Sequence, residues 1–357
     1  MVLCQYSAIS ATNYVIYMDS SKKSPIEVLI VAVPETAGSA LYGMLDVLLS
    51  AGNLWQTLVR SEDETQLFRV RIVSKDPGSF SCGNGIPVKP DCCIADEPSA
   101  QIIILPELWL GPDESLHDRH ARLINWIRGM YDGGATIYSA CSGAIMLAET
   151  GLLNGCHATS HWGYQDLFRK SYPMVRFDPA PNLAYADPAG RIVTAGGTTS
   201  WHDLALHIIS RHASPGEALR IAKVYLLKWH SEGNLPYASL VRPVPHGDSF
   251  VRKCEDWLRE HFRDIDAIVR VTGLADIPER TLKRRFKAAT GSSLIQYLQN
   301  LRVEEAKRLL ESSDHPVEEI SAEAGYSDTS FFRRVFKRLT GLTPSHYRRL
   351  FQPIASE

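Results

Sequence analysis

The apolar and polar positions divide the chain into two unlike parts. Between about residues 26 and 210, short continuous apolar runs alternate with amphipathic segments of helical length, such as 116–130 and 142–150. The runs span residues 28–33, 70–73, 102–105, 135–140 and 192–194. Continuous apolar strands separated by helices are typical of a parallel sheet that is buried on both faces. We therefore predict an α/β domain over residues 25–231.

The two ends of this domain have a different composition. Helical patterns at about 200–213 and 216–231 are followed by residues 232–247, where prolines and glycines gather and predict a linker. Residues 1–24 lack a basic region followed by an apolar run, so we predict a flexible N-terminal tail rather than a secretory signal. No apolar stretch reaches the roughly 18 residues needed to span a bilayer, which predicts no membrane partner.

The last part of the chain, residues 248–357, contains no strand pattern and predicts about seven helices separated by glycines. One motif occurs twice in it. Arg285-Phe286-Lys287, followed by Thr290-Gly291, recurs fifty residues later as Val335-Phe336-Lys337 with Thr340-Gly341. Both copies end a helix rich in Lys and Arg, although the net charge of the whole chain is −2. Two copies in matched contexts indicate two equivalent binding units.

The second copy has the pattern of a helix-turn-helix. A short helix ends at Gly325, where a helix C-terminus often requires a positive φ, and Ser327 is a suitable N-cap for the next helix. The inward face of that helix carries apolar residues at i, i+3, i+4 and i+7 spacing: Phe332, Val335, Phe336 and Leu339. A turn followed by a helix with a basic outer face predicts a recognition helix for the DNA major groove.

The first copy predicts a second unit of the same kind. A helix over 267–272 ends at Gly273, and the next begins near Pro278, a residue suited to the first helical position. Leu282 and Phe286 are expected to point inward. Between the units, residues 294–311 predict a helix of roughly 27 Å, which could hold the two recognition helices about one DNA turn apart, roughly 34 Å, on one face of a duplex.

Residues 248–350 resemble the DNA-binding domain of the AraC/XylS family. The likeness rests on segments 280–291 and 325–337 and on Gly341-Leu-Thr-Pro-Ser-His-Tyr-Arg348. It implies that both recognition helices contact base edges, through Arg280, Lys283, Arg284, Thr329, Ser330, Arg333 and Arg334. Four further basic residues are predicted to bind phosphate, which positions a protein without reading sequence: Arg285, Lys287, Lys337 and Arg338. The family commonly has Ser before the first recognition helix, where this chain has Ile277-Pro278, so Asp276 is the expected substitute cap.

The α/β part contains a cysteine at a strand-to-helix turn. The strand at 135–140 runs directly into Cys141, and a helix follows from Ser142. Such a nucleophile elbow is expected to expose the thiol, and the helix N-terminus to lower its pKa. His161 opens a later helix and could approach the thiol, because cysteine with histidine is the minimal activated pair. The plain alternative is a small buried Cys141 and a helix-capping His161.

Residues 25–230 resemble the PfpI-type class I glutamine amidotransferase-like superfamily, which implies a flavodoxin-like parallel sheet with helices on both faces. The likeness rests on residues 141–155, 158–162, 194–197 and 203–207. Joined to the AraC-type domain, it is similar to the GlxA-type regulator group. Superfamily enzymes often place a carboxylate beside the cysteine, at a position that is Ala40 here, and a Gly-Gly where this chain has Glu107-Leu108. Both departures imply a retired active site that is reused as a ligand pocket.

We therefore predict a pocket without catalytic residues, lined by Cys141, Ser142, His161, Trp162, Trp109 and Ala40. The two tryptophans could form part of a box for a cationic ligand, although a core or interface role is the stronger expectation. No carboxylate–histidine set predicts a metal site, and no cofactor is expected. Seven cysteines without a C-x-x-C motif indicate free thiols in a reducing cytoplasm.

Together these patterns predict a cytoplasmic, sequence-specific transcription regulator that acts as an activator. We expect it to bind double-stranded promoter or operator DNA as a homodimer formed through the α/β domain. A small-molecule effector, an amino acid or an amine, is expected near Cys141 and His161. Two alternatives stay open: an active Cys-dependent hydrolase or hydratase with a DNA-binding appendage, and a thiol redox sensor acting through Cys141.

Overall fold

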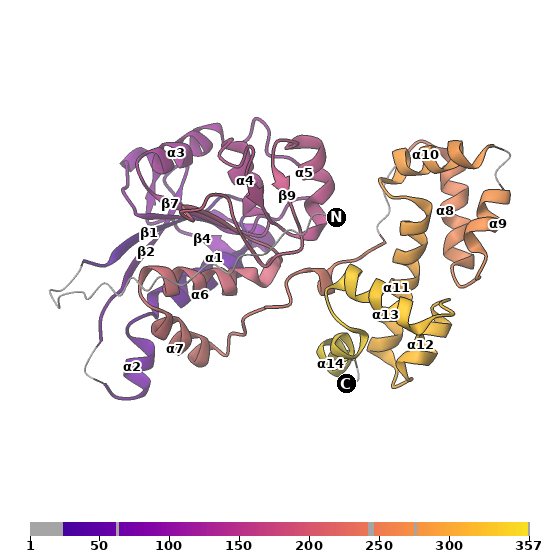
Figure 1. The fold of residues 1–357 in the computed structure, drawn as a ribbon. Helices are drawn as coiled ribbons and strands as arrows, with labels where there is room; N and C mark the ends of the chain where they lie inside the picture. Colours follow the sequence, from indigo (N-terminus) through magenta and orange to yellow (C-terminus); the bar gives the residue numbers. More distant parts are fainter. Residues whose placement is uncertain (1–23, 62–63, 242–245, 275–276, 356–357) are drawn as a thin grey trace.

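The structure, a computed structural model, describes residues 24–61, 64–241, 246–274 and 277–355. Figure 1 shows an α/β domain and an all-helical domain joined by a segment without long helices. The predicted tail over residues 1–24 lies outside the described residues except for its last position, and Asp276 lies outside them as well. None of the described helices is long and apolar enough to cross a membrane.

A seven-stranded sheet forms the centre of the α/β domain, in the order β10-β11-β7-β6-β1-β2-β5. Five strands coincide with the apolar runs: β1 (Ile26–Val31), β2 (Phe68–Ser74), β6 (Ile102–Leu105), β7 (Thr136–Ala140) and β11 (Ile192–Ala195). Two short strands extend the edges: β5 (Cys92–Cys93) and β10 (Leu183–Tyr185). Every pairing in this sheet is parallel except β10 with β11. The predicted parallel sheet is confirmed, with one antiparallel strand at its edge.

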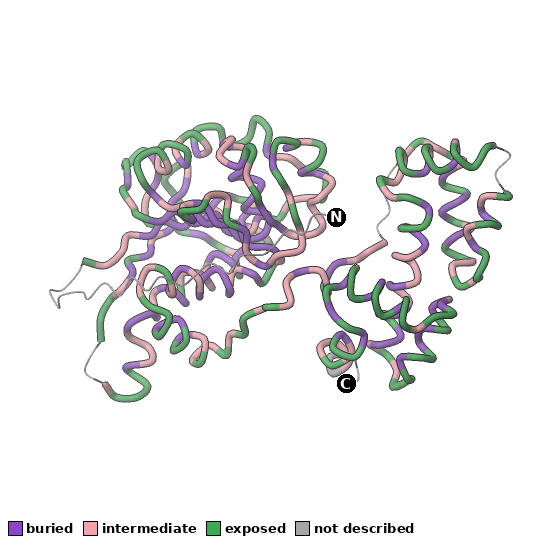
Figure 2. The backbone as a smooth tube through the Cα atoms, in the orientation of Figure 1, coloured by how far each residue is buried: buried purple, intermediate pink, exposed green. Residues whose placement is uncertain are grey.

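Helices cover both faces of the sheet, as predicted (Figure 1). On one side lie α1 (Gly38–Leu49), α2 (Leu54–Leu58), α6 (Trp201–His212) and α7 (Pro215–Tyr225); on the other lie α3 (Ala121–Asp132), α4 (Gly143–Glu149) and α5 (Gln165–Ser171). Neighbouring residues of β1 enter different cores, since Ile30 packs on the α1 side and Leu29 on the α4 side. Figure 2 accordingly shows the strands as buried and the outer helix faces as exposed.

Short elements connect these layers. They are the β3 (Phe80–Ser81) and β4 (Pro87–Val88) hairpin, the β8 (His157–Ala158) and β9 (Arg176–Phe177) pair, and the turns η1 (Gly83–Gly85), η2 (Ile94–Asp96), η3 (Trp162–Tyr164), η4 (Thr198–Ser200) and η5 (Leu235–Tyr237). Two predicted helices are shorter than expected. The helix predicted over 116–130 begins only at Ala121, and the one predicted over 216–231 ends at Tyr225 because Leu226 adopts a left-handed φ of 54°.

The C-terminal domain contains seven helices in the part of the chain that is described, in agreement with the prediction. They are α8 (Ser249–His261), α9 (Ala267–Gly273), α10 (Glu279–Thr290), α11 (Leu294–Ser312), α12 (Val317–Glu323), α13 (Thr329–Thr340) and α14 (Pro344–Ala355). Two hydrophobic cores form, one under α10 and the other under α13. α11 belongs to both, since Leu298 packs in the first and Leu310 in the second. The two predicted helix-turn-helix units are therefore separate modules on one shared helix.

Candidate DNA-binding surface and ligand pocket

The recognition helices α10 and α13 are matched in their inner faces and in their ends. Phe286 and Phe336 are fully buried, which fixes the rotation of each helix about its axis. Each helix ends at a glycine in the left-handed conformation, with φ of 76° at Gly291 and 77° at Gly341. The threonine hydroxyl before each glycine donates to the phenylalanine carbonyl at 2.8 Å. The Thr-Gly pair of the sequence repeat therefore ends both recognition helices in the same way.

The outer faces of these helices are open to solvent. The exposed residues are Arg280, Lys283 and Arg284 in α10 and Ser330, Arg333, Arg334 and Lys337 in α13, with Thr329 half-buried. Two of these residues form ion pairs on the surface: Lys283 with Glu279, and Arg333 with Glu318. Exposed pairs contribute little to stability, so DNA phosphates and bases can replace the acidic partners at small cost. The contacts of these residues with DNA stay a prediction.

Arg285 differs from the other basic residues of α10. Its guanidinium donates two hydrogen bonds to the Asp248 carboxylate, at 2.9 and 2.7 Å. The same carboxylate accepts the backbone N–H groups of Phe250 and Val251 at the start of α8. The Arg285 guanidinium also holds the pKa of Asp248 below its ordinary value. Arg285 therefore joins α10 to α8, and its predicted contact with phosphate stays a prediction.

The N-termini of the two recognition helices also differ from expectation. Asp328, and not Ser327, caps α13: its carboxylate accepts the N–H groups of Ser330 and Phe331 at 2.8 and 3.0 Å. Pro278 takes the cap position of α10 and supplies no side-chain hydrogen bond. A carboxylate cap also suits the positive end of the helix dipole.

Cys141 lies at a sharp turn between β7 and α4, as predicted, with a positive φ of 51°. Its environment differs from the prediction, because the residue is only 1% exposed. Burial raises the pKa of the Cys141 thiol, and the nearby Glu107 carboxylate raises it further. The expectation of an exposed thiol with a lowered pKa is therefore wrong: the packing around the elbow outweighs the helix N-terminus.

Glu107 places a carboxyl group beside Cys141, a neighbour that the sequence patterns did not predict. Its Oε1 lies 3.6 Å from the Cys141 Sγ and accepts the Thr198 hydroxyl at 3.0 Å. Burial raises the pKa of Glu107 above its ordinary value. The position predicted to hold such a carboxylate, Ala40, is fully buried in α1. The strand order could have revealed this contact. Glu107 follows β6, which is parallel to its neighbour β7, so both strands end at the same edge of the sheet.

Two other residues predicted to line the pocket have different environments. The Ser142 hydroxyl is buried and binds both the carbonyl and the N–H of Leu108, at 2.6 and 2.7 Å. It therefore fixes the loop after β6. Trp109 is 58% exposed and lies against Gly83, where a β-carbon would be 2.3 Å from the indole. Trp109 therefore packs on the outside of this loop.

A cavity of about 260 Å³ lies beside the elbow and contains His161 and Trp162. Its lining is His161, Trp162, Gly197, Thr198, Thr199, Ser200, His230, Gly233, Asn234 and Tyr237. The His161 and Trp162 rings are tilted on each other, with centroids 4.8 Å apart. Thr198 connects the cavity to the thiol, since its hydroxyl oxygen lies 4.0 Å from the Cys141 Sγ. The structure thus brings two of the predicted residues into one cavity and places Cys141 behind its wall.

The other wall of this cavity comes from residues 230–237, the last part of the predicted α/β domain and the start of the predicted linker. No sequence pattern indicated that these residues would face a pocket. His230 donates its backbone N–H to Asp203 at 3.0 Å and lies with its Nδ1 2.8 Å from the same carboxylate. Asp203 is fully buried in α6 and raises the pKa of His230. The Asn234 amide accepts the Gly197 N–H and donates to the Pro181 carbonyl. These contacts hold the start of the linker against the α/β domain.

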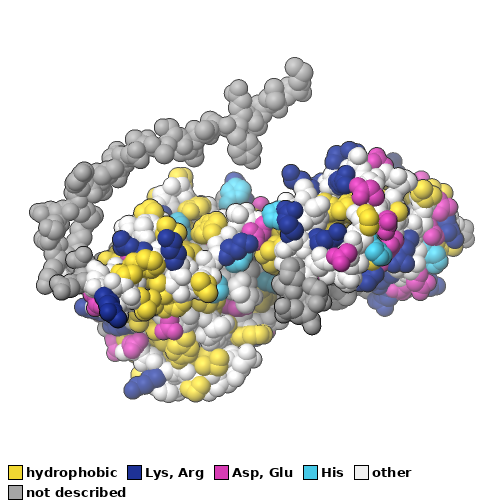
Figure 3. Space-filling model, turned by 90° about the horizontal axis from the view of Figure 1, so that it is seen from below, with side chains coloured by type: hydrophobic (Ala, Val, Ile, Leu, Met, Phe, Trp, Pro, Cys, Tyr) yellow, Lys and Arg dark blue, Asp and Glu magenta, His cyan; other side chains and the backbone are white. Residues whose placement is uncertain are grey.

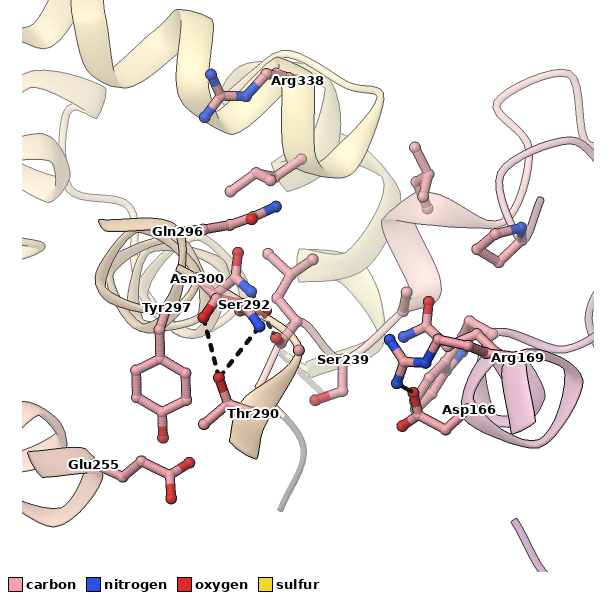
Figure 4. Close-up of a pocket in the computed structure, with 18 residues that line it drawn as sticks. Asp166, Arg169, Ser239, Glu255, Thr290, Ser292, Gln296, Tyr297, Asn300 and Arg338 are labelled. Atoms are coloured by element: carbon pink, nitrogen blue, oxygen red, sulfur yellow. Dashed lines mark hydrogen bonds and ion pairs between the residues drawn. The ribbon is translucent and has the colours of Figure 1, made fainter. Parts of the chain in front are cut away.

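A second cavity, of about 440 Å³, lies between the two domains (Figure 4). In Figure 4, Arg169 and its ion-pair partner Asp166 lie on one side of it, and Thr290 with Ser292 on the other. A β-carbon at Gly291, the end of α10, would be only 3.2 Å from an Arg169 nitrogen. The α/β domain therefore approaches the end of a recognition helix.

Two matched recognition helices define a DNA-binding protein, and its α/β domain has a cysteine elbow beside a cavity of about 260 Å³. Residues 272–350 match the family described as a helix-turn-helix domain, and residues 50–211 match the DJ-1/PfpI family. The chain combines a DJ-1/PfpI domain with an AraC-type helix-turn-helix domain, as both resemblances implied.

Similar proteins are named as transcriptional regulators. The chain is 26% identical over 293 residues to the HTH-type transcriptional regulator CdhR of Pseudomonas aeruginosa, covering 81% of this chain and 84% of the relative. It is 27% identical over 218 residues to the HTH-type transcriptional regulator GlxA of Rhizobium meliloti, covering 60% and 66%. It is 22% identical over 297 residues to the HTH-type transcriptional regulator GbdR of Pseudomonas aeruginosa, covering 81% and 78%.

Proposed function

We propose that the protein is a sequence-specific transcription regulator that acts on promoter or operator DNA in the cytoplasm, as an activator, and whose α/β domain senses a small metabolite. The observation that carries the proposal is the pair of recognition helices with matched ends and exposed basic faces. Two copies of such a surface have no use in a metabolic enzyme, whereas two adjacent major-groove sites require them. The regulators similar to this chain support the same function.

The rival enzyme function has one observation in its favour, the carboxyl group of Glu107 at 3.6 Å from the thiol. The thiolate is the nucleophile in cysteine catalysis, and here burial raises the thiol pKa while the neighbouring carboxylate adds to the effect. A protonated thiol that is 1% exposed suits neither catalysis nor oxidation by peroxide. We therefore assign His161 to the wall of a sensing cavity, with Cys141 and Glu107 packed behind Thr198, and none of the three to a catalytic set.

We assign the homodimer contact to the outer side of α6 and α7. Figure 3 views the molecule from this side and shows apolar side chains gathered on the α/β domain. Leu219, Leu226 and Trp229 are 57%, 89% and 46% exposed. Leu219 and Trp229 also line a groove of about 390 Å³ against α6. Exposed apolar patches mark interaction sites in soluble proteins. A second copy is the expected occupant because AraC-type units read paired half-sites. Sedimentation of Leu219→Glu, compared with wild type, tests this contact.

Selection of bound sequences from a random duplex library tests the DNA-binding function. The full chain should enrich two short motifs separated by about one helical turn. A matched variant, Arg284→Ala with Arg334→Ala, should lose the enriched motifs and keep weak, salt-dependent binding. If the wild-type chain enriches no motif, the proposed function is wrong.

A thermal-shift screen of the full chain with small metabolites tests the sensing function, with mass-spectrometric recovery of each compound. A compound that stabilises the protein and is recovered unchanged supports a sensor. A compound that wild type converts and Cys141→Ala leaves unchanged would show that the α/β domain is a Cys141-dependent enzyme.

A further inference from the structure

The segment over residues 230–241, which we name the strap, belongs to both domains. Its first half is bound to the α/β domain: the Asn234 N–H donates to the Ala180 carbonyl at 3.0 Å, and Asn234 also bonds Gly197 and Pro181. Gly233 fits against the same place, since a β-carbon there would be 2.5 Å from the Ala180 carbonyl oxygen. The start of the strap is therefore fixed, although its composition predicts a linker.

The second half of the strap is bound to α11. The Lys307 ammonium, which is only 7% exposed, donates to the Ala238 carbonyl at 2.8 Å. The Leu240 N–H donates to Glu304 at 2.8 Å, and the Leu240 carbonyl accepts from Asn300 at 3.0 Å. Three side chains of one helix face thus hold two residues of the strap.

The strap also contacts the second recognition unit. The Tyr237 ring lies edge-on to Phe351 of α14, with centroids 5.2 Å apart. η5 packs against α13, and a β-carbon at Gly341 would be 3.9 Å from the Leu235 β-carbon. Only three residues separate Asn234, held by the α/β domain, from Ala238, held by α11. A movement of Asn234 should therefore move Ala238 and the contacts of Ala238 with α11.

The same strap forms a wall of the 260 Å³ cavity, through His230, Gly233, Asn234 and Tyr237. The His230 Nδ1 faces the buried Asp203 carboxylate, while the side chain keeps 26% of its surface exposed. In the described part of the chain, the Nε2 of this ring has no hydrogen-bond partner. An imidazolium held by a carboxylate on one side presents a charged donor on the other.

The lining of the cavity favours a negatively charged group near His230. The ten lining residues include two histidines, two threonines and a serine but no aspartate, glutamate, lysine or arginine. A cationic ligand would find no carboxylate in this lining. An anionic group would find a charge-assisted donor at His230, which is stronger than a neutral hydrogen bond. The cavity volume is at the lower end for ligand sites, which favours a small molecule.

We propose that the effector presents an oxyanion, a carboxylate or a phosphate, to His230, and that its binding acts on the DNA-binding domain through the strap. This inference rests on the proposed sensing function and names both the chemistry of the ligand and the route of its effect. His230, the anion donor, and Ala238, the first residue held by α11, lie eight residues apart on this one segment. His230 is a binding residue, whereas Lys307 acts by positioning the strap.

Titration calorimetry with matched pairs of compounds tests the ligand chemistry on the full chain. The pairs are succinate with succinamide, and glycerol 3-phosphate with glycerol, with putrescine as a purely cationic probe. At least one anion should bind at least about tenfold more tightly than its neutral partner, and His230→Gln should remove that preference. The two pairs separate a carboxylate from a phosphate ligand. Binding of putrescine alone, binding of no anion, or an anion preference unchanged in His230→Gln would overturn the assignment.

The coupling is tested by fluorescence anisotropy on the selected DNA, with and without the anion that binds. Lys307→Met should keep anion affinity within about twofold and lose the effect of the anion on DNA affinity. Arg308→Met is the matched control, since Arg308 is 60% exposed, pairs with Glu305 in its own helix and should respond as wild type. Asn300→Leu, which removes the bond to Leu240, is the second variant if Lys307→Met does not fold. A wild-type response in a folded strap variant would overturn the route, while motif selection decides the proposed function independently.

Discussion

The two recognition units carry the same motif but are held together differently. At the equivalent position of the repeat, α13 has Val335, which is 2% exposed, and α10 has Arg285, which forms a half-exposed pair with Asp248. The N-terminus of α13 is capped by Asp328, whereas the Pro278 side chain makes no capping hydrogen bond to α10. Burial and capping stabilise more than an exposed ion pair. The comparison indicates that the second unit is the more rigid reader and the first the more adaptable one.

The largest effect should come from emptying one core. Phe336→Ala removes a fully buried ring and should cost about 3–5 kcal/mol, confined to the second unit. Hydrogen exchange of the full chain should show loss of protection in α12–α14 and retention in α8–α10. Phe286→Ala is the mirror variant and should give the reverse. Equal loss in both units from either variant would show that the two cores unfold as one.

The next effect concerns sequence reading. Arg334→Ala should cost about 1–3 kcal/mol at one base position, because an arginine can bind guanine through two hydrogen bonds. Lys337→Ala, three residues along on the same exposed face, should weaken binding to all sequences alike and lower the salt dependence. Affinity measured on the selected motif and its single-base variants separates the two. A uniform loss in Arg334→Ala would remove this residue from the base-reading set.

A smaller effect should follow from the cap. Asp328→Ala removes the acceptor of two backbone N–H groups and should cost about 1 kcal/mol of stability in the second unit. Ser327→Ala, one residue earlier, is the control and should be close to neutral. The check is the unfolding free energy in urea. A larger cost for Ser327→Ala than for Asp328→Ala would restore Ser327 as the cap.

The smallest effect is expected from acid. The pKa of Asp248 is lowered by Arg285, so the pair stabilises the first unit above the unfolded pKa of about 4 and is lost as the pH falls through the lowered pKa. As the pH is lowered, the backbone amides of α8 and α10 should therefore lose protection from hydrogen exchange before those of α12 and α13. Asp248→Asn should remove this difference between the units. A difference that persists in Asp248→Asn would assign the acid sensitivity to another group.

Much of the fold was predictable because its signals are local. The five apolar runs became strands since strands covered on both faces carry mostly apolar side chains, and the repeated Thr-Gly ends became two matched helix ends. His161 and Trp162 line one cavity, and their binding of a ligand stays a prediction. The cap of α13 was placed one residue too early, because Ser and Asp are both good caps and only the chain geometry chooses between them.

The missed features depend on residues that are distant in sequence. Glu107 reaches Cys141 from a neighbouring strand end, and the burial that raises the thiol pKa is the sum of several packed elements. Residues 232–241 of the strap were predicted as part of a linker because their proline and glycine disfavour a helix. They do not exclude a segment held by side chains of another element, and Lys307, Glu304 and Asn300 give no sign of this role in the sequence.

α11 runs through both recognition units and has a consequence for the promoters that such a protein can serve. A helix of 19 residues has a fixed length of about 28 Å, and no hinge in it is available to change the distance between its two cores. An inserted base pair between the two motifs would turn one of them by roughly 35° around the DNA axis, given about 10–10.5 base pairs per turn. Target sites should therefore tolerate substitutions between the motifs far better than insertions or deletions. Over evolution, the gap between the motifs should keep its length while its sequence drifts.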